Sequence, residues 1–228
     1  MTAAGRLGVG IVGAGRVGPV LGAALAGAGH ALTGVAAISA ASRERADALL
    51  PRVPVLPLPE VVERSELVLL AVPEAELPGL VQGLAETRAW VPGQLVVHTA
   101  PGLGTGVLAP ATAQGAIPLA LHPAMAFTGT SIDLVRLREA WCAVTAPAPV
   151  LPIGQALVVE MGAEPVVVAE ADRPRWAEAL ALLVARADET VDRAARLLDG
   201  IGVEDPAAVL GPVARSALER ALRRPLHP

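Results

Sequence analysis

Lysine and tyrosine are both absent from this chain of 228 residues, so arginine and histidine are its only basic side chains. An acid or base step at a lysine amine or a tyrosine phenol is therefore excluded. The single cysteine, Cys142, cannot form an intramolecular disulfide. This excludes a disulfide-based secreted scaffold and fits a reducing compartment, so we expect a cytoplasmic protein.

Aromatic residues are also scarce, at 2 % of the chain, and the formal net charge is −4. Without a basic surface or aromatic side chains for base stacking, nucleic-acid and membrane-surface partners are not expected. Residues 17–42 carry no formal charge, but glycines, Pro19 and His30 interrupt this stretch. A transmembrane helix needs about 20 strongly apolar residues in a row, so we expect none here. Residues 1–6 lack the charged-then-apolar order of a signal peptide.

Short apolar runs that end in turn or cap residues alternate with segments of helical periodicity. This alternation predicts an α/β fold with a doubly wound, mostly parallel sheet between helices. The predicted strands cover residues 7–12, 35–39, 67–72, 95–98, 117–121, 141–145 and 165–169. The predicted helices cover residues 17–28, 43–50, 59–64, 74–88 and 153–161. A weaker strand at 53–56 contains Pro54 and precedes Pro57, which would confine it to an edge or a loop.

After Asp172 only helical periodicity remains. Apolar residues from Trp176 to Leu198 recur at spacings of three and four, which predicts one long amphipathic helix. A second helix is expected to begin after Asp205, which would be its N-cap. We therefore expect one α/β domain over residues 1–170 and a small all-helical domain over 171–228. The long apolar stripe exceeds what one following helix can cover, which favours a homodimer.

A strand, a glycine-rich turn and a helix follow one another at the start of the chain. In the Gly-x-Gly-x-x-Gly spacing, Gly13 allows a tight turn, Gly15 leaves room for a pyrophosphate, and Gly18 lets helix and strand pack closely. The helix N-terminus would offer free N–H groups to the phosphates. The sequence thus predicts a Rossmann dinucleotide-binding domain. Its predicted pyrophosphate-binding residues are Gly13, Ala14, Gly15, Arg16, Val17 and Gly18.

The end of the second predicted strand distinguishes NADP from NAD. An NAD site usually places an acidic residue there for the ribose hydroxyls, and this chain has none. It offers Ser39, Ser42 and Arg43, whose hydroxyls and guanidinium suit the 2′-phosphate of NADP. Alternatively, Ser42 is only an N-cap and Arg43 only a solvated first-turn residue. We expect NADP.

Other candidates lie where predicted strands end. Ala71, Val72 and Pro73 would pass over the cofactor, and Thr99 follows a neighbouring strand. Histidines His98 and His122 end two strands. Either could orient a substrate carbonyl or donate a proton, and either could instead bind the backbone and shape a turn.

The remaining histidines have weaker claims. His30 resembles a helix C-terminal cap residue, and His227 lies in the tail. No two possible ligands stand at metal-binding spacing beside a strand end, so no metal site is expected.

The chain resembles Rossmann-like proteins that carry domain of unknown function 2520, usually described as NADP oxidoreductases. They belong to the wider 6-phosphogluconate dehydrogenase and pyrroline-5-carboxylate reductase group. The resemblance implies a dinucleotide domain to about residue 170 and a helical domain that dimerises and helps to enclose the site. The resemblance rests on residues 9–18, 39–43, 69–73 and 96–99. It rests above all on residues 119–130, Leu-Ala-Leu-His-Pro-Ala-Met-Ala-Phe-Thr-Gly-Thr.

Three departures from this family concern the catalytic half. After Thr99, where relatives carry Ser-Gly-x-His, this chain has Ala-Pro-Gly-Leu at 100–103. In the long helix, where relatives carry His-x-x-Asn-His, it has Leu-Leu-Val-Ala-Arg at 182–186. The sequence also ends before a further C-terminal segment of most relatives, as expected of a truncated member.

Two functional hypotheses follow. The first is an NADP-dependent oxidoreductase that transfers a hydride to a C=O or C=N bond of a small metabolite that the sequence does not identify. The lysine acid/base of some relatives is absent, so His98, His122 or water would have to serve. The second is a catalytically eroded NADP-binding protein that senses a nucleotide or partners an enzyme.

Overall fold

The computed structural model describes residues 6–224, which form parts of two compact units, Met1–Ala177 and Glu178–Pro228. The tail histidine at position 227 lies outside the described residues. No helix within residues 6–224 has the length and apolar character that crossing a bilayer requires.

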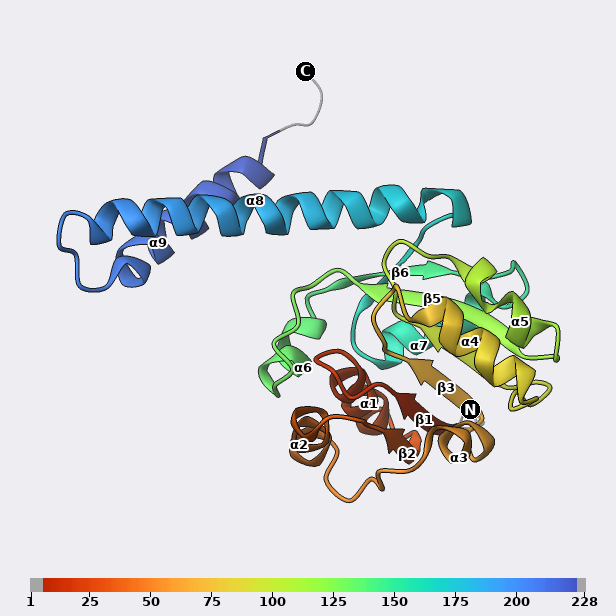
Figure 1. Ribbon diagram of the computed structural model, residues 1–228. Helices are drawn as coiled ribbons and strands as arrows, with labels where there is room; N and C mark the ends of the chain where they lie inside the picture. Colours follow the sequence, from red (N-terminus) through yellow and green to blue (C-terminus); the bar gives the residue numbers. More distant parts are fainter. Residues whose placement is uncertain (1–5, 225–228) are drawn as a thin grey trace. The chain divides into compact units, whose positions relative to one another are not determined.

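The first unit is built on one seven-stranded sheet (Figure 1). Its strands are β1 (Gly8–Val12), β2 (Ala31–Ala36), β3 (Leu67–Leu70), β4 (Leu95–His98), β5 (Ile117–Pro123), β6 (Trp141–Thr145) and β7 (Glu164–Val167). They are arranged in the order β2-β1-β3-β4-β5-β6-β7. All neighbours are parallel except β5 and β6. The chain runs from β1 to β2 and returns to β3 on the other side of β1, so the carboxyl ends of β1 and β3 form the switch point where such sheets bind ligands.

Helices cover both faces of this sheet, as Figure 1 shows. One face packs against α1 (Gly18–Gly27), α2 (Ala40–Leu49), α6 (Ile132–Leu137) and α7 (Leu151–Glu160). The other packs against α3 (Leu58–Glu63), α4 (Leu77–Glu86) and α5 (Ala109–Thr112). Short 3₁₀ turns lie at Thr105–Leu108 and Glu170–Asp172. The predicted doubly wound, mostly parallel fold is thereby confirmed.

Alternating strand residues explain this layering. In β3, Leu67 and Leu69 face the first layer, whereas Val68 and Leu70 face the second, and all four are at most 3 % exposed. A strand buried on both faces reads as a continuous apolar run, which is why these strands could be recognised in the sequence.

The second strand was misplaced by the sequence analysis. The prediction was 35–39, whereas β2 spans Ala31–Ala36. β2 lies at the edge of the sheet and is only half-buried, so its first residues lack the apolar run that marks the inner strands. The weak strand predicted at 53–56 is reduced to one isolated bridge, between Val55 and Val35. Helices α5 and α6 were not predicted; α5 has only four residues, too few to show a helical period.

The second unit contains most of α8 (Arg173–Asp199) and all of α9 (Pro206–Leu222). Asp205 caps α9 as predicted, accepting a hydrogen bond from the Ala208 amide at 3.0 Å. None of the described residues of this unit is buried. Its exposed apolar side chains include Leu182, Leu183, Val191, Leu197, Val209, Val213 and Leu218.

Candidate functional site

The glycine-rich turn between β1 and α1 has the geometry of a pyrophosphate cradle. Gly13 has φ +98°, and a Cβ there would lie 2.5 Å from the Ala71 carbonyl oxygen. A Cβ on Gly18 would collide with the Gly13 carbonyl oxygen. A Cβ on Gly15, by contrast, would meet nothing within 4 Å. Two glycines therefore close the turn, and the third leaves open space above it.

Helix α1 starts at this open space with unused donors. Its N-cap residue, Val17, makes no side-chain cap hydrogen bond. Pro19 lies in the first turn, where its missing N–H costs no hydrogen bond. The amides of the first turn thus have no intrahelical partner and suit a phosphate. The residues present fit the pyrophosphate of a dinucleotide.

A cavity of about 790 Å³ extends from this turn toward β2 and α2. Ser39, Ser42 and Arg43 line it, and Glu76 is the only carboxylate among its lining residues. Ser39, not Ser42, caps α2, because its Oγ accepts the Ser42 amide at 3.1 Å. Arg43 is exposed, and its Nε donates to the Ala37 carbonyl oxygen at 3.4 Å. A guanidinium and the N-terminus of α2 therefore face a cavity whose β2 edge has no acidic group.

A second cavity, of about 340 Å³, continues from the first. The two share Gly15, Ala71, Val72 and Pro73. Its polar side chains are Arg16, Glu74, Thr99 and His122. The structure thus gathers most of the predicted site residues around two joined cavities. Ala14 lines the first and Val17 the second, whereas Gly18 and His98 line neither.

His122 on β5 lines the second cavity beside Phe127. Its Nδ1 accepts a hydrogen bond from the indole Nε1–H of Trp176 at 3.0 Å. The two rings meet edge to face, with centroids 6.3 Å apart and planes at 86°. Burial, reinforced by the nearby charge of Arg173, lowers the pKa of His122 from 6.5 to about 4. The imidazole is therefore neutral at pH 7.

His98, at the end of β4, has 0 % exposure. Its Nδ1 accepts the Ala100 amide at 3.2 Å, and its Nε2 lies 2.9 Å from the Gly104 carbonyl oxygen. Since a backbone amide can only donate and a carbonyl only accept, both ring nitrogens are engaged. Burial lowers the pKa of His98 to about 4. These contacts hold the loop after Thr99 in place.

His30 has a different role from the predicted helix cap. Its backbone N–H binds the Leu25 carbonyl oxygen near the end of α1, but its side chain points elsewhere. Nδ1 accepts the Leu7 amide at 3.2 Å, and Nε2 lies 2.8 Å from a Glu160 carboxylate oxygen. The imidazole therefore connects the start of β1 with α7, away from both cavities.

Arg173, which the sequence analysis did not single out, is completely buried at the start of α8. Its Nε donates to the Thr145 hydroxyl at 2.8 Å, and one terminal nitrogen donates to the Ala120 carbonyl oxygen at 2.6 Å. The other terminal nitrogen is buried without a hydrogen-bond partner among the described residues. Burial lowers the pKa of Arg173 to about 10, so the guanidinium stays charged at pH 7. Its charge disfavours protonation of both His98 and His122.

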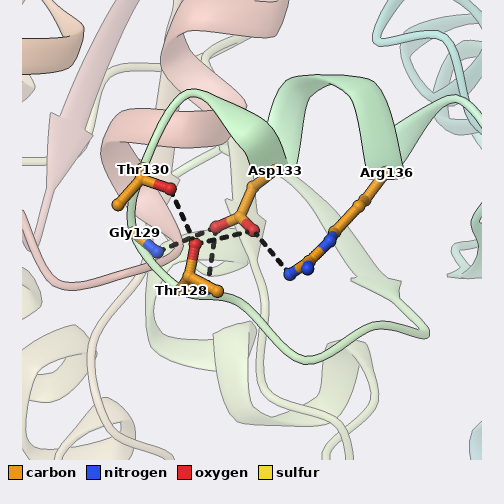
Figure 2. Close-up of polar contacts among 5 residues, drawn as sticks. All are labelled: Thr128, Gly129, Thr130, Asp133 and Arg136. Atoms are coloured by element: carbon orange, nitrogen blue, oxygen red, sulfur yellow. Dashed lines mark hydrogen bonds and ion pairs between the residues drawn. The ribbon is translucent and has the colours of Figure 1, made fainter. Parts of the chain in front are cut away.

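The loop between β5 and α6 is held by Asp133, as Figure 2 shows. One carboxylate oxygen of Asp133 accepts the Thr128 and Gly129 amides at 2.8 Å each, and the other accepts the Thr128 hydroxyl at 3.0 Å. Gly129 has φ +79°, and a Cβ there would lie 3.2 Å from the Arg16 Cα. The loop therefore packs against the glycine-rich turn, with Phe127 at the second cavity.

Within residues 6–224, no three histidine, cysteine or acidic side chains lie close enough together to hold a metal ion.

Comparisons with known proteins agree with this fold. The family model of the Rossmann-like domain matches residues 2–123, and that of the domain of unknown function DUF2520 matches residues 140–227. No curated protein matches the chain by sequence.

Solved structures are similar in fold. A candidate NADP oxidoreductase from Bacteroides fragilis has a TM-score of 0.79 and 18 % identity, covering 96 % of this chain and 82 % of that one. A reductive aminase from Aspergillus terreus, in complex with NADPH and ethyl-5-oxohexanoate, has a TM-score of 0.68 and 18 % identity over 95 % of this chain and 74 % of its own. Pyrroline carboxylate reductase of Plasmodium falciparum with NADP bound has a TM-score of 0.67 and 11 % identity, covering 96 % of this chain and 81 % of its own.

At sequence identities of 11–18 %, similarity to these solved structures establishes only the fold. Family membership rests on the family models instead. With more than half of its length matched, the chain belongs to the Rossmann-like family, and its C-terminal part is a DUF2520 domain.

Proposed function

We propose that this chain is an NADP-dependent oxidoreductase that transfers a hydride between NADPH and a C=O or C=N bond of a small metabolite. One observation carries the proposal: two cavities join at Gly15, the one glycine of the motif above which a side chain would find open space. A dinucleotide laid across this turn would place its adenosine half in the larger cavity and its nicotinamide in the smaller one.

The preference for NADP rests on the larger cavity. Arg43 and the N-terminus of α2 would face the 2′-phosphate, and no carboxylate from the β2 edge would oppose it. The pyrophosphate would lie on the open first turn of α1. The names of similar structures, which mention NADP or NADPH, support a nicotinamide cofactor here.

The smaller cavity supports a reaction at its His122 wall. His122 lines the smaller cavity, whereas His98 lines neither of the two joined cavities and has both ring nitrogens bound to backbone. We therefore assign substrate contact to His122 and a structural role to His98. The bound cofactor would supply the hydride, and the protein would supply placement.

Calorimetric titration of NADPH and NADH tests this proposal. We expect NADPH to bind at least about tenfold more tightly, because a charge-assisted hydrogen bond contributes about 1.5–3 kcal/mol. Arg43→Ala should abolish most of this preference. Glu44→Ala, at the neighbouring exposed position of α2, is the matched control and should preserve it. Equal affinities for the two cofactors would contradict the assignment.

A second candidate function is a binding protein that has lost catalysis. Ala100 and Pro101 line the smaller cavity where the related proteins carry polar residues, and this favours the alternative. In that case NADPH would raise the melting temperature by mass action, yet no ketone, imine or 2-oxo acid would oxidise it. Turnover of any of these substrates would exclude this candidate.

We also propose that the protein acts as a homodimer. The described residues of the second unit bury no side chain, and two helices without a core are not stable alone. A second copy of the same apolar surface would supply that core. The cytoplasmic location remains a prediction from the lone cysteine.

A further inference from the structure

The hydrogen bond between Trp176 and His122 determines which ring nitrogen carries the proton. An indole N–H can only donate, so His122 Nδ1, 3.0 Å away, must accept and is therefore unprotonated. A neutral imidazole then carries its single proton on Nε2.

The proton-bearing nitrogen is accessible from the smaller cavity. His122 Nε2 makes no hydrogen bond among residues 6–224. Among residues 6–224, the one buried side-chain nitrogen or oxygen without a hydrogen-bond partner belongs to Arg173. His122 Nε2, which also lacks a partner, is therefore not buried. The nitrogen is thus open to the cavity that His122 lines.

We propose that Trp176 is a positioning residue that holds His122 as the Nε2–H tautomer, so that this site takes a substrate whose reacting heteroatom is a hydrogen-bond acceptor: a carbonyl rather than an iminium. The inference rests on the proposed function. It excludes the iminium form of C=N and leaves C=O, together with any neutral imine, as the acceptors that this donor can bind.

The surroundings keep His122 from acting as an imidazolium. Its ring is largely buried, and the buried guanidinium of Arg173 lies nearby without a carboxylate in ion-pair distance among the described residues. A neutral N–H donor can polarise a carbonyl and stabilise the oxygen as it gains charge.

An iminium would need a hydrogen-bond acceptor in the site, because its N–H⁺ group can only donate. Glu74 is the only carboxylate that lines the smaller cavity. It is exposed, and it already accepts the Gly102 amide at 2.9 Å. Arg16, the other charged group of the lining, is cationic and would repel an iminium.

The reaction balances without a proton from the histidine. NADPH held at the glycine-rich turn would supply the hydride that forms the new C–H bond at the carbonyl carbon, and would leave as NADP⁺. The π electron pair moves to the oxygen, which His122 Nε2–H binds, and solvent supplies the proton that completes the alcohol. His122 keeps its proton throughout.

Nitrogen NMR of ¹⁵N-histidine-labelled protein tests the tautomer without a substrate. At pH 7, His122 of the wild type should show a protonated Nε2 and an unprotonated Nδ1, with the spectrum of His122→Gln identifying its signals. Trp176→Phe should convert this into a mixture of tautomers. Trp141→Phe removes an indole that is 57 % exposed and is the matched control, which should leave the His122 signals unchanged. A wild-type His122 protonated on Nδ1, or a Trp176→Phe spectrum equal to that of the wild type, would overturn the proposal.

An NADPH oxidation assay tests the substrate class. Small ketones and 2-oxo acids should be reduced, and preformed cyclic iminium compounds should not. Trp176→Phe should lower kcat for the carbonyl substrate by about tenfold or more, with the calorimetric affinity for NADPH unchanged.

Faster reduction of the iminium compounds would overturn the carbonyl assignment while leaving the proposed oxidoreductase intact. Turnover of neither class would overturn the assignment together with catalysis. If the wild type does not bind NADPH, the proposed cofactor is rejected, and the NMR spectra still decide the tautomer.

Discussion

His98 makes the stability of the fold depend on pH in a calculable way. The side chain has 0 % exposure, and both ring nitrogens bind backbone groups. Protonation would place an Nδ1–H against the Ala100 amide N–H, so the native state resists it. Burial accordingly lowers the pKa of His98 from 6.5 to about 4.

The direction of the effect follows from proton binding in the two states. The unfolded chain protonates His98 as the pH falls below about 6.5, whereas the native state does so only near pH 4. The stability is therefore fully present above pH 6.5 and is lost as the pH falls toward 4. Between pH 7.5 and pH 5 this one group should lower the free energy of unfolding by about 2 kcal/mol.

His98→Gln isolates this contribution, because glutamine keeps an acceptor oxygen and a donor N–H₂ group but does not titrate. His122, which also titrates late, is present in both proteins and cancels. Urea unfolding at one protein concentration, followed by tryptophan fluorescence at pH 7.5, 6.5, 5.5 and 5, gives the comparison. The stability advantage of the wild type over the variant should shrink by about 2 kcal/mol across this range. Parallel pH profiles would refute the reasoning.

Three further predictions concern the cradle, the loop and the second unit. Gly15→Ala should leave the melting temperature unchanged but weaken NADPH binding by about tenfold or more in calorimetry, because its Cβ would occupy the phosphate space. Gly79→Ala in α4, where a Cβ also meets nothing within 4 Å, should leave NADPH binding unchanged and can only raise the melting temperature, because alanine favours a helix over glycine. Asp133→Ala should lower the free energy of urea unfolding by about 3 kcal/mol, since two backbone amides lose their acceptor, against at most about 0.5 kcal/mol for the exposed Asp188→Ala. Light scattering should find a dimer for the wild type and a monomer for Leu183→Glu, and a monomeric wild type would reject the proposed interface.

Local patterns were sufficient for much of the fold. The strands Leu95–His98 and Trp141–Thr145 have the predicted bounds, because each is an apolar run closed by clear turn residues. The glycine motif also predicted the tight turn between β1 and α1, since its spacing encodes close backbone approaches that are local in the chain. The half-buried edge strand β2 was misplaced because no buried run marks its start.

Contacts between distant residues could not be read in the same way. Trp176 was assigned to the apolar stripe of the long helix, although its indole N–H binds a histidine 54 positions earlier. Arg173 reaches a carbonyl 53 positions away, and nothing in its sequence neighbourhood distinguishes it from a solvated arginine. The cap at Ser39 shows the same limit on a smaller scale: the pattern located the start of α2 but not which serine caps it.

The absence of lysine, of tyrosine and of the polar residues that related proteins carry after Thr99 need not end catalysis at this site. Those groups would serve as proton donors, but hydride transfer to a carbonyl can also be accelerated by placement and by a fixed dipole at the oxygen. In the proposed reaction His122 would supply such a dipole, oriented by Trp176 and kept neutral by burial and by the charge of Arg173. The proton would then come from solvent. A site of this kind loses the rate advantage of a positioned acid, about 10²–10⁴-fold, but keeps the contribution of orientation. Slow carbonyl reduction with little pH dependence between 6 and 8 is therefore the behaviour that this arrangement of residues would produce.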